Sequence, residues 1–256
     1  MRTLWIASCM VLSATSFANG TFEYTDAQGK VFEGYVARPK TRDLKPRPLV
    51  LVVHDWNGLD QYEMGRCDQL AELGYVAVAV DVYGKGIRPK TPAECAKEAG
   101  KYYGDAKMWH ARLRAGLDAA LKRPDVDAKK VAAIGYCFGG TAVLEMMRAG
   151  MPVVGVAAFH GGLVGPSRAD SDARIRTQVL ALNGKDDMMV TAQNRDAFEK
   201  EMKDAGVVFR MVNYGGAVHA FTVPGSEKAG IPGVAYNEKA DKASWRELLK
   251  FLRGVF

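Results

Sequence analysis

A cysteine flanked by two glycines is the feature of this chain best suited to chemistry. Gly135-Tyr136-Cys137-Phe138-Gly139 follows an apolar, strand-like run at 131–134 and precedes a helical pattern over 140–149. This is the strand–elbow–helix layout of the G-x-nucleophile-x-G motif, with cysteine where serine usually stands. The glycines remove side chains that would clash in so tight a turn, and the adjacent helix N-terminus favours a thiolate. A buried structural cysteine is the alternative interpretation.

Partners for such a nucleophile follow along the chain. An apolar strand predicted over 177–183 leads to Asp186 and Asp187, and the loop after the next strand contains His219. Hydrolases built on this elbow have the chain order nucleophile, acid, base. The order predicts Cys137 as the nucleophile, Asp186 or Asp187 as the acid and His219 as the base.

These three side chains together would hydrolyse a carboxylic ester through a covalent intermediate. His219 would accept the thiol proton, and the acid, Asp187 or Asp186, would hold the imidazole in the required tautomer. Cys137 would attack the ester carbonyl to form an acyl-thioester, which water activated by His219 would then hydrolyse. The oxyanion needs fixed donors, and the backbone N–H of Phe138, directly after the nucleophile, is one candidate.

Alternating strands and helices are expected to position these residues. After a hairpin that turns at 27–29, strand and helix patterns alternate, which predicts parallel pairing with right-handed crossovers. The runs at 49–53 and 76–80 are continuously apolar, as in strands covered on both faces. The predicted fold class is therefore α/β, with a mostly parallel central sheet, helices on both faces and an N-terminal antiparallel hairpin. Strands are predicted near 22–26, 31–37, 48–54, 75–81, 130–136, 153–160, 177–183 and 207–213, and helices near 60–73, 91–102, 105–122, 140–149, 192–204 and 239–253.

Five motifs, spread over most of 22–256, carry a resemblance to a known family. They are 52–59 (VVHDWNGL), 81–86 (DVYGKG), 135–140 (GYCFGG), 184–187 (GKDD) and 214–222 (YGGAVHAFT). With them the chain resembles the dienelactone hydrolase (carboxymethylenebutenolidase-like) family of the α/β-hydrolase superfamily. The resemblance implies a single α/β-hydrolase domain over 19–256 that hydrolyses esters or lactones. It also implies the N–H of Trp56 as the second oxyanion donor, and its usual spacing of the acid favours Asp187.

Further pocket residues are expected from the resemblance and from positions at the carboxyl ends of strands. Asp55 stands where the family has a glutamate that influences ionisation of the thiol, although a loop-capping role is equally compatible with an aspartate. Tyr83, Lys85 and His160 fall at strand ends and are expected near the substrate, with a structural histidine as the alternative for His160. Lys85 and Ala220 replace an arginine and a serine that hold the substrate carboxylate in dienelactone-cleaving members. This departure predicts that a muconate-type dienelactone is a poor substrate.

Composition narrows the classes of function. The 256 residues are 48% hydrophobic and 25% charged, enough for one domain with a substantial core. The formal net charge of +6 is scattered rather than gathered into a stripe with aromatic residues, which argues against nucleic acid as a partner. The expected partner is a small ester or lactone, with no cofactor and no metal ion. Turn-rich stretches at 84–92, 161–174 and 224–236 are interpreted as loops over the site. His110 is interpreted as scaffold, and His54 as a residue that hydrogen-bonds within its loop.

The N-terminus resembles a targeting segment. Arg2 precedes an apolar run at 3–13, and 16–18 fits a small-x-small cleavage site, so 1–18 is predicted to be a signal peptide of an exported, periplasmic protein. A lipoprotein processed at Cys9 and a short buried helix are the alternatives. After cleavage no run reaches the roughly 20 apolar residues that span a bilayer. If Cys137 is the nucleophile, only Cys67 and Cys95 are left for a disulfide, and the sequence leaves that bridge open.

Two other functions compete with the hydrolase. An accessible, acidic thiol at Cys137 would also suit a redox or thiol-binding protein, although no second cysteine lies near the elbow in the sequence. A catalytically idle scaffold used for binding is the other alternative, and the three intact candidate positions argue against it. The natural substrate and the oligomeric state are left open.

Overall fold

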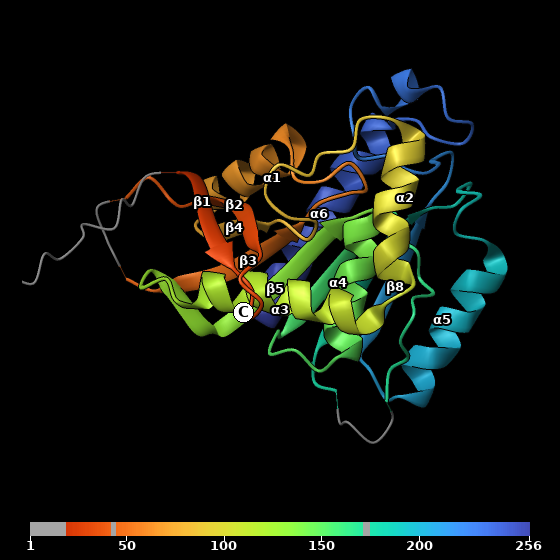
Figure 1. Cartoon of the computed structure of the whole chain (residues 1–256). Coiled ribbons are helices and arrows are strands. Elements are labelled where there is room, and N and C mark those ends of the chain that lie inside the picture. Colours follow the sequence, from red (N-terminus) through yellow and green to blue (C-terminus); the bar gives the residue numbers. More distant parts are fainter. Residues whose placement is uncertain (1–18, 42–44, 171–174) are drawn as a thin grey trace, which may run out of the picture.

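A computed structural model describes residues 19–41, 45–170 and 175–256, so the predicted signal peptide, including Cys9, lies outside the described residues. The described chain forms one eight-stranded sheet in the order β1-β2-β4-β3-β5-β6-β7-β8 (Figure 1). β2 pairs antiparallel with β1 and β4, and the other pairings are parallel, which confirms the expected α/β sheet with its hairpin. The strands are β1 (Gly20–Thr25), β2 (Val31–Ala37), β3 (Arg47–Val53), β4 (Val76–Val80), β5 (Val126–Tyr136), β6 (Gly155–Phe159), β7 (Gln178–Gly184) and β8 (Phe209–Tyr214).

Helices cover both faces of this sheet. They are α1 (Gln61–Glu72), α2 (Pro92–Tyr103), α3 (Ala106–Leu121), α4 (Phe138–Arg148), α5 (Ala192–Asp204) and α6 (Glu238–Val255), with a short 3₁₀ helix η2 (Ser226–Ala229). Successive strand residues point to opposite sides. Leu49 and Leu51 of β3 accordingly belong to a buried cluster shared with α2, α3, α4 and α5, whereas Val50 and Val52 belong to a second cluster shared with α1 and α6.

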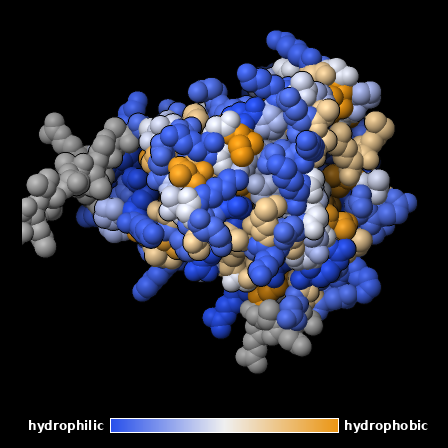
Figure 2. All heavy atoms as spheres, in the orientation of Figure 1, coloured by the Kyte–Doolittle hydropathy of each residue, from blue (hydrophilic) through white to orange (hydrophobic). Residues whose placement is uncertain are grey.

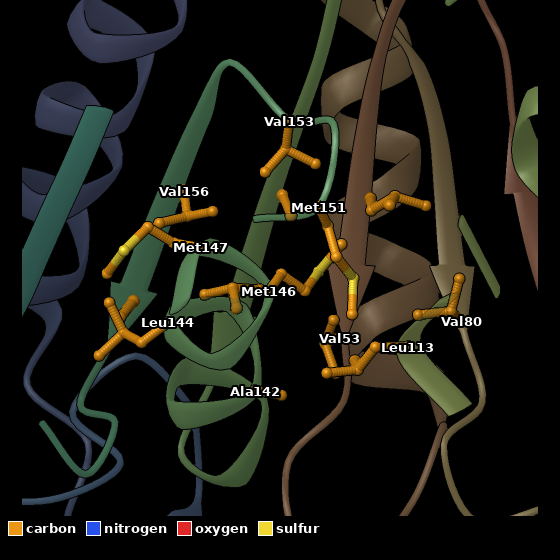
Figure 3. Close-up of a cluster of buried hydrophobic side chains, with 14 of the residues drawn as sticks. Val53, Val80, Leu113, Ala142, Leu144, Met146, Met147, Met151, Val153 and Val156 are labelled. Atoms are coloured by element: carbon orange, nitrogen blue, oxygen red, sulfur yellow. The ribbon is translucent and has the colours of Figure 1, made fainter. Parts of the chain in front are cut away.

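Helix α4, which directly follows the predicted nucleophile, lies wholly inside the core. All 11 of its residues are buried. Met146 packs in the same cluster as Val53 of β3 and Leu113 of α3 (Figure 3). Burying a side chain of this size stabilises the fold by about 1.5–3 kcal/mol. The packing of α4 in the core therefore fixes the position of its N-terminus and of the turn before it.

Strand β5 begins earlier than the apolar pattern predicts. It starts at Val126 rather than near 130, because the pairing with β3 shifts between Pro48 and Leu49. Residues 128–130 are exposed in this irregular part of the strand, and two of them are lysines. Charged side chains in the bulged part of the strand interrupt the continuous hydrophobic pattern from which strands were predicted.

The two remaining described cysteines are free thiols. Cys67 is buried in α1 and Cys95 is buried in α2, so the disulfide left open by the sequence is not formed. On the face drawn in Figure 2, hydrophobic side chains are scattered among hydrophilic ones. Nowhere in the described part of the chain does a helix combine the length and the apolarity needed to cross a bilayer.

Candidate active site

Cys137 occupies a strained turn between β5 and α4. Its φ of 50° and ψ of −112° lie outside the ordinary regions for a residue with a side chain. Strain of this kind persists where the surroundings enforce it and is concentrated at functional sites. A Cβ at Gly135 would collide with the Gly139 carbonyl, and one at Gly139 would collide with the Val53 carbonyl. The two glycines are therefore required by close backbone approach, as the motif indicates.

Three polar side chains meet at this turn. The Cys137 Sγ lies 3.1 Å from His219 Nε2, and His219 Nδ1 lies 2.9 Å from Asp187 Oδ2. His219 is 7% exposed and Asp187 is 3% exposed, whereas Cys137 is partly exposed toward a cavity. The imidazole can therefore exchange a proton with the sulfur on one side while the carboxylate holds its other nitrogen.

The loops after β7 and β8 are bonded to each other, and this brings the carboxylate to the imidazole. The Lys185 N–H donates to the Tyr214 carbonyl at 2.8 Å, and the Asp186 N–H donates to the Ala217 carbonyl at 3.1 Å. A Cβ at Gly184 would collide with that Ala217 carbonyl. The loop ends at His219, whose N–H donates to the Gly233 carbonyl at 3.0 Å.

The two candidate acids, Asp186 and Asp187, point in different directions. Asp187 accepts the Met189 N–H at 2.8 Å with Oδ1, and its Oδ2 contacts His219. Asp186 is exposed and accepts the Gly216 N–H at 2.8 Å. The structure therefore places Asp187, and not Asp186, against the imidazole.

The electrostatics of the site favour a protonated His219. Burial alone would lower its pKa, but the Cys137 sulfur and the Asp187 carboxylate outweigh that effect and raise the pKa of His219 to about 10. Asp55 lies on the same cavity, and burial raises its pKa to about 7. Burial also raises the pKa of Glu63, which accepts the Asp55 N–H at 3.3 Å, well above its usual range.

His54 holds the loop after β3 to the end of β4. Its Nδ1 lies 2.6 Å from the Asp55 carbonyl oxygen, and its Nε2 accepts the Val82 N–H at 3.0 Å. Both ring nitrogens are thus bonded to backbone atoms, and burial lowers the pKa of His54. The interpretation of His54 as a residue that hydrogen-bonds within its loop agrees with these contacts.

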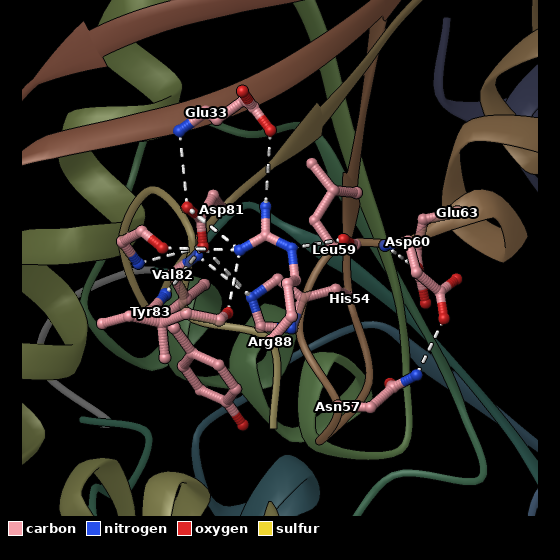
Figure 4. A network of polar contacts seen from close by, with 12 residues as sticks. Glu33, His54, Asn57, Leu59, Asp60, Glu63, Asp81, Val82, Tyr83 and Arg88 are labelled. Carbon is pink, nitrogen blue, oxygen red and sulfur yellow. Dashed lines mark hydrogen bonds and ion pairs between the residues drawn. The ribbon is translucent and has the colours of Figure 1, made fainter. Parts of the chain in front are cut away.

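A polar network that includes Asp81, Tyr83 and Arg88 (Figure 4) supports the loop that carries Trp56. Asp81 accepts the N–H groups of Tyr83 and Gly84, both at 3.0 Å. Arg88 lies 3.6 Å from Asp81 and donates through Nε to the Leu59 carbonyl at 2.6 Å. The buried Tyr83 hydroxyl donates to the Trp56 carbonyl at 3.1 Å, so the loop that carries Trp56 is held at both ends.

Phe138 anchors the start of α4. Its ring stacks on Trp109 at 4.7 Å and lies 5.2 Å from the ring of Tyr83. As the first residue of the helix, Phe138 has an N–H with no intrahelical acceptor. Cys137 therefore sits beside a backbone donor whose direction is fixed by a buried aromatic cluster.

A cavity of about 260 Å³ opens beside the sulfur. Most of its wall is apolar, and the exposed Lys90 is the only lysine or arginine among the described lining residues. It is lined by Asp55, Trp56, Asn57, Lys90, Pro92, Cys95, Cys137, Met189, His219, Ala220, Val223, Ser226, Ala229, Ile231 and Val234.

Three residues expected at the pocket do not line this cavity. Lys85 forms an exposed ion pair with Glu23 at 2.6 Å, so its expected place beside the substrate is wrong. The reason is that residue 85 follows the turn after β4 and its N–H bonds to the Val31 carbonyl of the hairpin strand β2. Tyr83 and His160 are fully buried behind the site, where both act through hydrogen bonds to backbone.

Several lining residues were missed by sequence reasoning. Lys90 and Pro92 come from the turn-rich stretch 84–92, and Ser226, Ala229, Ile231 and Val234 come from 224–236. Those two stretches behave as predicted, and their turn-rich composition was the available signal. Stretch 161–174 was expected to join them, but its described residues stay away from the cavity. They are bonded instead to two charged side chains elsewhere in the fold. The buried Arg148 donates to the Leu163 carbonyl at 2.8 Å, and Glu201 accepts the Ala169 N–H at 2.8 Å.

No cluster of three or more His, Cys, Asp or Glu side chains suited to a metal ion is present among the described residues.

Comparison with known proteins gives similarity over nearly the whole chain. The model of the dienelactone hydrolase family matches residues 32–256. The crystal structure of a dienelactone hydrolase-like promiscuous phosphotriesterase from metagenomic libraries is 33% identical, with a TM-score of 0.85, over 93% of this chain and 99% of that one. A second structure, m3DLH, is 32% identical, with a TM-score of 0.87, over 93% of this chain and 98% of that one. A Salmonella typhimurium protein named provisionally as a carboxymethylenebutenolidase is 26% identical over 235 residues, which are 88% of this chain and 83% of that protein.

Proposed function

Because the chain belongs to the dienelactone hydrolase family and is a hydrolase of esters or lactones, we propose that it acts through Cys137, His219 and Asp187 as a nucleophile–base–acid triad. The observation that carries the proposal is the continuous contact from sulfur to imidazole to carboxylate, 3.1 Å and then 2.9 Å. It lies at the wall of the cavity, where a substrate carbonyl has access to the sulfur.

The first half of the reaction forms a covalent intermediate. His219 Nε2 takes the proton of the Cys137 thiol, and the resulting thiolate attacks the carbonyl carbon of the ester. The carbonyl oxygen becomes an oxyanion that the backbone N–H groups of Phe138 and Trp56 stabilise. When the tetrahedral species collapses, the bond to the alkoxy oxygen breaks, and that oxygen takes the proton from His219. The acyl group is left on Cys137 as a thioester.

The second half of the reaction returns the enzyme to its starting state. His219 removes a proton from water, and the hydroxide formed attacks the thioester carbonyl. The same two N–H groups hold the second oxyanion, whose collapse breaks the C–S bond. The sulfur leaves as a thiolate that pairs with the protonated His219, and this ion pair is ready for the next substrate. Asp187 keeps the Nδ1 proton of the imidazole in place throughout and stabilises its positive charge.

Asp55 makes the charge of the proposed site depend on pH. With its pKa raised to about 7 by burial, this carboxyl is largely neutral below neutral pH. A neutral carboxyl beside the cavity does not oppose the negative charge that develops on the carbonyl oxygen. An ionised one does, so Asp55 makes the proposed reaction sensitive to pH.

The lining of the cavity favours apolar substrates. Ala220 and Val223 form part of the wall near His219, and neither offers a hydrogen bond from its side chain to a substrate carboxylate. Lys85 is turned away to Glu23. We therefore expect neutral esters and lactones to be hydrolysed in preference to a carboxylate-bearing dienelactone.

Replacement of the cysteines tests the proposed nucleophile. Cys137→Ala should remove nearly all turnover of a p-nitrophenyl ester, and iodoacetamide should inactivate the wild type with label on Cys137. Cys67→Ala and Cys95→Ala are matched controls that should keep most of the activity. Cys67 lies in the core, and Cys95 lines the cavity but its thiol bonds to the Pro89 carbonyl. Full activity of Cys137→Ala would exclude the triad. Alkylation of Cys137 in a protein that turns over no ester or lactone would favour the redox or thiol-binding alternative.

Export to the periplasm by cleavage before Asn19 stays a prediction. It rests on the order of charged, apolar and small residues over 1–18.

A further inference from the structure

A buried histidine that does not touch the cavity links the elbow to the loop of His219. His160 directly follows β6, and its Nδ1 lies 3.1 Å from the backbone nitrogen of Cys137. Its Nε2 lies 2.8 Å from the Thr222 Oγ1. A backbone N–H only donates, so Nδ1 accepts and Nε2 carries the proton toward the threonine hydroxyl. The Cys137 N–H also donates to the Phe159 carbonyl at 3.0 Å, so it is shared between two acceptors.

Backbone strain is concentrated along the same link. Cys137, His160 and Ala220 are the described residues other than glycine that have positive φ, at 50°, 39° and 54°. These residues follow β5, β6 and β8. Because β5 to β8 are parallel, the carboxyl ends of these strands lie at the same end of the sheet. The two hydrogen bonds of His160 run to the first strained residue and to Thr222, two positions after the third. Such backbone persists where neighbouring contacts hold it.

The far end of the link is fixed by two helices. Thr222 is fully buried, and its Oγ1 lies 2.7 Å from the Tyr62 hydroxyl of α1. Arg66 of α1 donates to the Thr222 carbonyl at 3.1 Å and to the Asp241 carboxylate of α6 at 2.6 Å. Thr222 is therefore held from the side of the sheet that carries α1 and α6.

His160 has the surroundings of a fixed, neutral group. It is fully buried, and its ring lies 5.3 Å from the ring of His219 and 5.3 Å from that of Phe221. Burial, together with the positive charge of His219, lowers the pKa of His160 well below its usual range. A ring that stays neutral keeps one tautomer, and with it both hydrogen bonds.

We propose that His160 is a positioning residue which, through Thr222, holds the Cys137 turn and the His219 loop at the separation that proton transfer needs. The inference rests on the proposed triad. Cys137 and His219 belong to loops after different strands, so nothing in the local sequence fixes the 3.1 Å between their reacting atoms. Displacing reacting groups by about 1 Å can cost on the order of 10²-fold in rate. The cavity wall does not include His160 or Thr222, so substrate binding should be spared.

The test combines four variants with a double-mutant cycle. Thr222→Val removes the hydroxyl, Thr222→Ser restores it, and His160→Asn keeps an acceptor near Cys137 but no longer reaches Thr222. Thr177→Val is the matched control, because Thr177 is also a buried threonine whose hydroxyl donates to a backbone carbonyl, that of Val153 at 2.8 Å, before β7 begins. Stability is followed by Tm, and ester turnover is separated into kcat and KM.

We expect His160→Asn and Thr222→Val to lower kcat by roughly 10- to 100-fold, with KM changed less than about twofold. Thr222→Ser should recover most of the loss, and Thr177→Val should lower Tm alone. The double variant should be no slower than His160→Asn, because both changes break one link. Alkylation of Cys137 by iodoacetamide should slow in parallel.

Three outcomes would overturn the inference: an unchanged kcat in folded Thr222→Val, a kcat loss equal to that of Thr177→Val, or additive losses in the double variant. Failure of the proposed function is seen separately, as a Cys137→Ala protein with full activity. The alkylation rate needs no turnover, so it measures the link between elbow and loop even in that case.

Discussion

His54 and His219 are two buried histidines that follow β3 and β8 of one sheet, and their partners give them different chemistry. His219 bonds to Asp187 at 2.9 Å through one nitrogen and presents the other to the Cys137 sulfur. His54 has a carboxylate too, but Asp81 stands 3.9 Å away and both ring nitrogens are occupied by backbone atoms (Figure 4). A nearby carboxylate is thus not sufficient to make a base, because a free nitrogen must also face the reacting atom.

The pKa values of His54 and His219 differ in line with their contacts. Burial acts on both rings and lowers the pKa of His54, whereas sulfur and carboxylate raise the pKa of His219 to about 10 despite burial. Groups with strongly shifted pKa values mark functional sites only in combination with geometry. The contacts of His54 support the Trp56 loop, whereas those of His219 fit the proton transfer that we propose for it.

The largest expected effect separates the two histidines directly. His219→Gln should lower kcat/KM by at least about 10⁴-fold, a loss typical of removing a triad member. His54→Gln should lower the free energy of unfolding by about 1–3 kcal/mol, since backbone groups lose buried partners, with less than about 10²-fold loss of activity. Urea denaturation and ester kinetics measure the two effects. A larger kinetic loss for His54→Gln would reverse the assignment.

The carboxylates provide the second expected difference. Asp187→Asn should reduce kcat by roughly 10³- to 10⁴-fold, because an amide can hold the wrong imidazole tautomer. Asp186→Asn, one residue away and exposed, should change kcat by less than about threefold. Steady-state kinetics with a p-nitrophenyl ester decides between them. The reverse ranking would transfer the role of acid to Asp186.

Substrate choice provides the third difference, between the apolar wall near His219 and the surface that carries Lys85. Without a bidentate cation or the serine hydroxyl, a dienelactone carboxylate loses about 1.5–3 kcal/mol of charge-assisted bonding, or one to two decades in affinity. A neutral lactone of similar size should therefore have the higher kcat/KM. Lys85→Ala should alter neither value by more than about twofold, because an exposed ion pair with Glu23 contributes little. Preference for the dienelactone, lost in Lys85→Ala, would refute this expectation.

The smallest expected effect concerns the pH dependence contributed by Asp55. Its pKa of about 7 means that the carboxyl ionises as the pH rises through neutrality, close to the developing oxyanion. A repulsion of about 1 kcal/mol corresponds to a roughly fivefold fall in kcat/KM. The pH–rate profile of the wild type should show this step near pH 7, and Asp55→Asn should lack it. An unchanged step in the variant would assign it to another group.

Asp55 should also change how the stability of the folded protein depends on pH. The folded-state pKa is raised from 3.8 to about 7, so between these pH values the folded protein binds a proton that the unfolded chain has lost. Stability contributed by Asp55 is therefore lost as the pH rises through this window, by about 1.4 kcal/mol for each pKa unit. Asp55→Asn should flatten the dependence of Tm on pH between 4 and 7, and a steeper dependence would contradict the raised pKa.

Much of the fold and the elements of the site could be predicted from local patterns. Continuous apolar runs predict strands such as β3 and β4, because a parallel strand is buried on both faces. The glycines around Cys137 and the chain order of Cys137, Asp187 and His219 point to their elements. Local patterns were less reliable where charge interrupts them, as at the start of β5, or where a turn sends a side chain to the outside, as for Lys85.

The sequence by itself determined which residue types stand at the ends of which strands, because periodicity and turn chemistry are properties of neighbouring residues. Only the tertiary structure decided which of them meet. Asp187 rather than Asp186 reaches His219 because the β7 and β8 loops are bonded together, and His160 lies behind Cys137 because β5 and β6 are adjacent in the sheet. Such contacts join residues 23 to 82 positions apart, and their distances depend on the packing of the whole core rather than on any local segment.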